Sequence, residues 1–198
     1  MEKVVEGVII LAEMEGVDSY LCQAAAYCHD LGRVIEEEKG LYNPIPGTPG
    51  HAGLGVIPTK EILRKVGIVG QDAKNVIEAV KVHQLKKYEG RNKIVLILQD
   101  ADRKNGLGKW GVIRAMAFNL EMNIPKPSEK ELDAAIDKNF KVIKKDPKLI
   151  RKFIENTDFS MTWYSELLNT RSAREYLKED YLYTKKLHEQ ARNWEKNV

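Results

Sequence analysis

The residue pair with the clearest chemical potential is His29 and Asp30, at the end of the segment AAAYCHDLGR. The residues before the pair are apolar, and a carboxylate buried there is costly unless it is paired or bound to a metal ion. Successive helical residues point about 100° apart, so two side chains at a helix end can reach the same ion. An isolated His-Asp pair is equally explained by a surface carboxylate beside a hydrogen-bonded histidine.

A second acidic segment, LQDADR, holds Asp100 and Asp102 and ends at Arg103. Residues two apart on a helix face roughly opposite sides, so only one of the two carboxylates can point inward with the apolar face. Taken alone, the segment is also explained by a solvated helix end whose acids pair with Arg91, Lys93 or Arg103.

Two further histidines complete the set of candidate ligands. His51 follows a loop rich in proline and glycine, and His83 lies on the apolar face of an expected helix. Each alone is explained as a packed core residue. With His29, however, three of the four histidines fall in the first half of the chain, each in a different element. Imidazole and carboxylate together suit Mn, Fe, Co, Ni, Zn or Mg, depending on the share of histidine, so a divalent metal site is predicted.

The elements that must position these side chains are predicted to be helices. The run IVLILQ also fits a buried strand, but no partner strand is evident, so we interpret it as a buried helix. Helices are expected over residues 4–12, from 19 to near 32, over 59–65, 72–85, 93–102 and 108–116, from 128 to about 145, briefly from 147, and over 172–196.

Two stretches interrupt the helical pattern. Residues 33–50 include GLYNPIPGTPG and are expected to form a long loop, and Pro125 with Pro127 marks a second one. The prediction is an all-α single domain over residues 1–198, with a metal-site core at 1–124 and a helical extension at 125–198.

Composition excludes several classes of protein. With 43% hydrophobic and 31% charged residues, the 198-residue chain is globular rather than disordered. No apolar run approaches the ~20 residues that span a bilayer, and acids interrupt the apolar N-terminus, so we expect a cytoplasmic protein without membrane contact. The net charge of +3 argues against a nucleic-acid polymer as partner. Cys22 and Cys28 are expected to be reduced and buried.

These motifs together resemble the HD-domain superfamily of metal-dependent phosphohydrolases. AAAYCHDLG is similar to the family's His-Asp helix, ILQDADRKNGLGKWGVIR to its second Asp segment, and GHAGLGVIPTKEIL and VKVHQ to segments that carry extra histidines in many members. The resemblance covers about residues 1–120 and implies an HD-like helical bundle. It implies as metal ligands His29, Asp30, Asp100, His51 and His83.

The resemblance also implies an activity and roles for side chains. A phosphohydrolase would act on a phosphomonoester or phosphodiester, such as a nucleotide, with Asp30 orienting the attacking water. His51 and His83 would bind a second metal, contact phosphate or protonate the leaving group. The negative charge of a small phosphorylated substrate would be neutralised by Arg103, or by Lys86, Lys87 or Arg114.

A second hypothesis is an HD-like domain that binds a ligand without catalysis. The alignment places the family's first histidine immediately before Met1, with Glu2 about half a turn out of register. Either the chain begins inside the natural domain, or the site lacks this ligand, and the second case favours the hypothesis. We therefore expect weak metal binding, or compensation by His51 or His83. The sequence leaves open the substrate, the identity and number of metal ions, and the oligomeric state.

Overall fold

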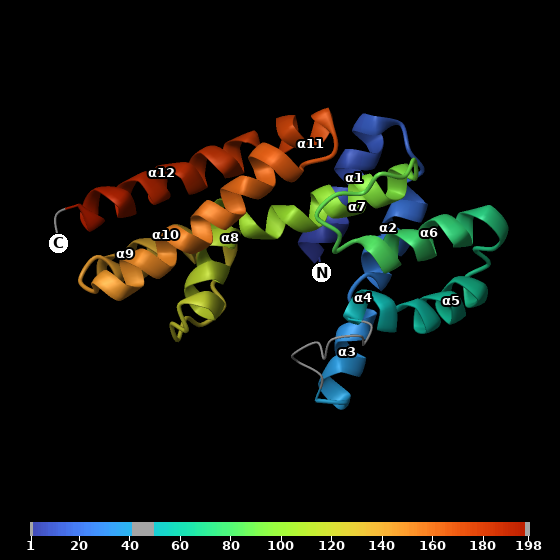
Figure 1. The fold of residues 1–198 in the computed structure, drawn as a ribbon, viewed down its shortest axis with the longest axis horizontal. Coiled ribbons are helices and arrows are strands. Elements are labelled where there is room, and N and C mark those ends of the chain that lie inside the picture. The colour runs from blue at the N-terminus through green and yellow to red at the C-terminus, as the bar shows by residue number, and fades with distance from the viewer. Residues whose placement is uncertain (1, 41–49, 197–198) are drawn as a thin grey trace. The chain divides into compact units, whose positions relative to one another are not determined.

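The structure is a computed structural model that describes residues 2–40 and 50–196. All regular elements within these two ranges are helices, which confirms the predicted all-α class. The chain divides into two compact units, Met1–Asp102 and Arg103–Val198, and each is described by itself (Figure 1). The predicted single domain with a boundary at residue 124 stays a prediction.

The first unit carries the histidines of the predicted site. Its helices in the described residues are α1 (Glu2–Glu15), α2 (Ser19–Cys28), α3 (Leu31–Glu38), α4 (His51–Leu54), α5 (Val56–Lys65), α6 (Gly70–Val82) and α7 (Lys93–Arg103), the last of which ends on the first residue of the second unit. The run IVLILQ is therefore helical, as interpreted from the sequence. Of the loop predicted over residues 33–50, residues 41–49 lie outside the described residues.

The helix starts and stops follow from local chemistry. Gly16 adopts a positive φ of 62° and allows the chain to leave α1, as expected of a glycine after a helix. Asp18, rather than Ser19, caps α2, because its carboxylate accepts hydrogen bonds from the backbone N–H groups of Tyr20 and Leu21.

The expected second helix is shorter than predicted. It ends at Cys28 instead of near Gly32, and a two-residue turn at His29 and Asp30 leads into α3. The segment 31–38 was expected to lie mostly in a loop, and this prediction was wrong. The helix forms because the chain turns at Asp30 and α3 then packs against α4, with Gly32 buried at the contact.

The core of the first unit is made of small and branched aliphatic side chains. Helix α2 packs against both α1 and α6, and its alanines and cysteines permit the close approach. Gly7 serves the same purpose on α1, because a Cβ there would lie 3.2 Å from Ala101 Cβ on α7. The fully buried side chains include Val8, Leu11, Cys22, Ala25, Val76, Val80, Val95 and Leu98.

The second unit is a separate set of packed helices. They are α8 (Gly108–Arg114), α9 (Leu132–Ile143), α10 (Pro147–Thr162), α11 (Arg171–Tyr176) and α12 (Lys178–Glu195), with short turns at Lys104–Gly106 and Glu129–Glu131 and π-helical turns at Ala115–Asn119 and Trp163–Leu167. The capping box predicted at Ser128 and Glu131 is present.

Two lengths in the second unit differ from the prediction. The helix expected to be short after Pro147 runs for 16 residues, because Asp146 caps it and Ile150, Phe153 and Ile154 give it a buried face. The expected single terminal helix is divided at Leu177 into α11 and α12. Helices α10 and α12 lie side by side (Figure 1).

The second unit has an apolar and aromatic core of its own. Phe140 and Phe153 meet edge to face with ring centroids 5.2 Å apart, and Trp194 covers Phe140. Buried aliphatic residues from α8, α9, α10 and α12 surround these rings. Among the described residues of both units, no helix is long and apolar enough to cross a membrane.

Candidate metal centre

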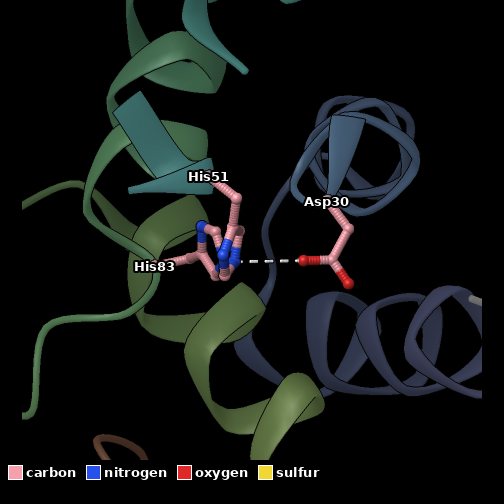
Figure 2. A group of neighbouring side chains, drawn as sticks. All are labelled: Asp30, His51 and His83. Atoms are coloured by element: carbon pink, nitrogen blue, oxygen red, sulfur yellow. Dashed lines mark hydrogen bonds and ion pairs between the residues drawn. The ribbon is translucent and has the colours of Figure 1, made fainter. Parts of the chain in front are cut away.

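Asp30 stands at the turn between α2 and α3, in the position where an aspartate normally caps the following helix. Asp18 and Asp146 do cap their helices, whereas the Asp30 side chain makes no cap hydrogen bond to α3. Its carboxylate points instead toward two histidine rings (Figure 2). The carboxylate is therefore held for contacts with other elements rather than for helix formation.

Gly32 fixes the distance between Asp30 and His51. A Cβ on Gly32 would lie 1.9 Å from the backbone oxygen of His51, so only glycine allows α3 to approach α4 this closely. His51 is the first residue of α4 and is buried. The close backbone contact therefore brings its ring next to the Asp30 carboxylate.

His29 and His83 are each positioned by the end of a helix. They are the residues that follow α2 and α6, and both are buried. Nδ1 of His29 is 2.6 Å from the Ala26 oxygen, and Nδ1 of His83 is 2.7 Å from the Val80 oxygen. A carbonyl only accepts, so both Nδ1 atoms carry a proton, and in the neutral form of each ring Nε2 presents a lone pair.

The Nε2 atoms and the Asp30 carboxylate converge. His51 Nε2 lies 3.2 Å from Asp30 Oδ1 and 3.3 Å from His83 Nε2. One ligand atom from each of the three residues lies within 4.8 Å of the others (Figure 2). Ligand atoms about 2.1 Å from an ion, with angles of 90–110° between them, are themselves about 3.0–3.4 Å apart. The distances from His51 Nε2 to Asp30 Oδ1 and to His83 Nε2 therefore match shared coordination of one ion.

The lone pairs supply a second sign that a cation fits. His29 Nε2 faces Asp30 Oδ2 at 3.4 Å and Asp102 Oδ1 at 3.8 Å. A lone pair aimed at two carboxylates is unfavourable unless a proton or a metal ion lies between them. The nitrogen and oxygen donors suit a divalent transition metal. The residues present therefore fit the metal that the sequence predicts.

Neighbouring charges keep the carboxylate ionised. Burial would raise the pKa of Asp30, but the hydrogen bond from His51 and the charges of His29 and Arg33 outweigh it, and the pKa lies well below its usual value. Burial also lowers the pKa of His83, assisted by the charges of His29 and His51. Asp30 is thus negative and His83 neutral near pH 7, which are the forms that bind metal.

The two aspartates of α7 have different surroundings. Asp100 is completely buried, whereas Asp102 is part exposed and approaches His29. Asp102 Oδ1 lies 3.8 Å from His29 Nε2, which brings an acid of α7 next to the histidines. The sequence analysis assigned Asp100 as the ligand and Asp102 as its companion. That assignment of Asp100 stays a prediction, and the geometry adds Asp102 to the candidate ligands.

The basic residues predicted to meet phosphate lie in different places. Arg103 is buried, and its guanidinium donates a hydrogen bond to the Leu167 backbone oxygen within the second unit. The side chain of Lys87 is highly exposed, with Glu89 3.6 Å away. Lys86 also follows α6, and Arg114 is exposed at the end of α8. Their predicted phosphate roles stay predictions.

Three residues around the centre were missed by the sequence analysis. Arg33 Nε lies 3.1 Å from Asp30 Oδ1, Glu36 Oε2 lies 3.6 Å from His51 Nδ1, and Gln84 Nε2 lies 3.4 Å from the same nitrogen. The spacing of Asp30, Arg33 and Glu36 at three-residue intervals is typical of a helix surface. It went unrecognised because residues 33–50 were interpreted as a loop.

Comparison with known families agrees with this geometry. The family model described as HD domain matches residues 1–105, more than half of the 198-residue chain. The chain belongs to the HD domain family. The matched region contains every residue of the candidate centre, from His29 to Asp102. No curated protein and no solved structure matches the chain.

Proposed function

We propose that this HD domain protein is a metal-dependent phosphohydrolase that acts on a phosphomonoester or a phosphodiester, with nucleotides as the first substrates to test. The observation that carries the proposal is the convergence of Asp30 Oδ1, His51 Nε2 and His83 Nε2 at distances suited to one ion. The HD family, whose members are generally phosphohydrolases, supplies the reaction class.

Several side chains of the first unit would bind the ion together. Asp30, His51 and His83 would hold it, with His29 and Asp102 facing the same centre. A bound divalent ion polarises a phosphoryl oxygen and lowers the pKa of a water molecule toward neutrality. Because the Nε2 lone pairs of His51 and His83 serve as ligands, we assign these histidines to metal binding rather than to protonation of the leaving group.

Arg33 would meet the substrate. Its side chain is 57% exposed while its Nε holds Asp30 Oδ1 at 3.1 Å, so positive charge lies at the open edge of the centre. A phosphate bound there would receive hydrogen bonds from the remaining guanidinium N–H groups. The ionised Asp30 carboxylate, kept in place by Arg33 and His51, would orient the water that attacks phosphorus.

The test is hydrolysis of a general phosphomonoester and a general phosphodiester with added Mn²⁺, Ni²⁺, Co²⁺ or Mg²⁺, followed by a set of nucleotides. We expect metal-dependent turnover that is lost in Asp30→Ala and retained in Lys87→Ala, since Lys87 is an exposed residue outside the centre. Metal binding without turnover on any of these substrates would contradict the proposal and favour a ligand-binding HD domain without catalysis.

A further inference from the structure

His51 differs from the other two histidines in what its Nδ1 contacts. His29 and His83 follow the last turns of α2 and α6, where carbonyl oxygens lack helical partners, and their Nδ1 atoms bind the oxygens of Ala26 and Val80. His51 begins α4. The first turn of a helix offers unpaired N–H groups rather than oxygens, so the acceptor for a proton on His51 Nδ1 must come from another element.

Two side chains compete for that nitrogen. Glu36 Oε2, from α3, lies 3.6 Å from His51 Nδ1 and can only accept a proton. Gln84 Nε2, from the residue after His83, lies 3.4 Å away and can only donate. Both distances exceed those of a strong hydrogen bond, so neither contact fixes the ring.

Each competitor selects a different tautomer of His51. When Gln84 donates to Nδ1, the ring proton lies on Nε2, where Asp30 Oδ1 at 3.2 Å and the lone pair of His83 Nε2 at 3.3 Å can accept it. When Glu36 accepts from Nδ1, the His51 Nε2 lone pair is released toward Asp30 and His83. Only the second tautomer leaves Nε2 able to bind metal.

We propose that Glu36 is a positioning residue that selects the metal-binding tautomer of His51 and that Gln84 stabilises the metal-free one. The inference rests on the proposed metal centre. Glu36 is well placed for this, because its side chain is only 15% exposed and its Oε2, which faces His51 Nδ1, also lies 3.9 Å from Arg33. A carboxylate behind a histidine ligand also increases the basicity of the ring toward the ion.

The experiment measures binding of Zn²⁺ alone, by competition with a chelating dye, without any substrate. Loss of such a second carboxylate costs roughly 10- to 100-fold in metal affinity, and we expect this loss in Glu36→Ala. Glu36→Gln should lose less, because its amide oxygen still accepts the Nδ1 proton. Gln84→Ala should bind zinc at least as well as the wild type. The matched control is Glu37→Ala, which removes the same charge from an exposed position of α3.

A second measurement distinguishes positioning from folding. Long-range ¹H–¹⁵N NMR of the zinc-loaded wild type should show His51 with its proton on Nδ1 and zinc on Nε2. Equal zinc affinity in Glu36→Ala and Glu37→Ala, or zinc bound through Nδ1 of His51, would overturn the inference while leaving the proposed function intact. A wild-type chain that binds no zinc or other divalent metal would overturn both.

Discussion

Each unit of the molecule buries histidine, but with opposite outcomes. In the second unit, His188 Nδ1 lies 2.8 Å from Thr157 Oγ1, and its Nε2 lies 3.4 Å from both Asp158 Oδ1 and Arg192 Nε. The Thr157 hydroxyl donates to the Phe153 oxygen and so accepts from His188. In the first unit the protonated nitrogens are satisfied in the same way, but the other nitrogens face one another and two carboxylates.

The difference teaches that burial does not distinguish a structural histidine from a ligand. His188 is buried, and so are His29, His51 and His83. What separates them is whether the second ring nitrogen has a donor. Arg192 Nε–H points at His188 Nε2, whereas the lone pairs of the first unit converge on a common point. In the second unit a guanidinium N–H therefore occupies the second nitrogen of His188, whereas in the first unit the corresponding nitrogens can take a cation.

The largest stability effect expected is confined to the second unit. Phe153 is completely buried in its aromatic core, so Phe153→Ala should lower the free energy of unfolding by about 3–5 kcal/mol. Metal affinity should not change, because no candidate ligand lies in that unit. Chemical denaturation and a metal titration measure the two quantities, with the exposed Phe159→Ala as control. If the folded Phe153→Ala variant also lost metal affinity, the metal centre would not be confined to the first unit.

A smaller loss of stability, with a larger functional effect, is expected at Gly32. A Cβ there meets the His51 backbone 1.9 Å away, so Gly32→Ala must displace α3 from α4. Overpacking of this kind costs about 1–3 kcal/mol. The shift also separates Asp30 from His51, so metal affinity should fall with it. Denaturation and metal titration of Gly32→Ala are compared with Val34→Ala, an exposed change on the same helix.

Retained metal affinity in Gly32→Ala would show that the close approach of α3 and α4 is not what holds the two ligands together. The turn between α2 and α3 would then be the feature that positions Asp30.

The smallest effect expected is a pH dependence in the second unit. Burial lowers the pKa of His188 from its ordinary value of 6.5, despite the opposing charge of Asp158. The unfolded chain therefore binds a proton at a higher pH than the folded chain does. The contribution of His188 to stability is complete above about pH 6.5 and is lost as the pH falls below it.

The measurement is the free energy of unfolding against pH for the wild type and His188→Gln. Their difference should change between pH 6.5 and the lower pKa of the folded state, and stay constant above pH 7. If the stability of the wild type minus that of His188→Gln decreases as the pH rises toward 6.5, the assigned direction is contradicted.

Most helices could be predicted from the sequence because apolar periodicity, caps and prolines act locally. The helical interpretation of IVLILQ and the capping box at Ser128 depended on such local patterns. Helix α3 was missed although Leu31, Val34 and Ile35 have helical spacing, because the segment was interpreted together with the proline- and glycine-rich stretch that follows it. Its packing against α4 supplies the remaining stability. Tertiary contacts of this kind are not visible in a single sequence.

The candidate site divides along the same line. His29, Asp30, His51 and His83 could be named from residue type, spacing and resemblance. The partners of those side chains could not, since Glu36 and Gln84 reach His51 from elements that meet only in the folded unit. The orientation of Asp102 depends on the rotation of α7, which periodicity leaves open between its two acids.

The most direct test is a metal titration, monitored by calorimetry, of the wild type, His83→Ala and His188→Ala. The account predicts that the wild type and His188→Ala bind a single ion with equal affinity. His83→Ala should lose more affinity than the roughly 10- to 100-fold expected when a residue that only orients a metal ligand is removed. Equal affinity in wild type and His83→Ala, or loss of the ion in His188→Ala alone, would contradict a metal centre at Asp30, His51 and His83.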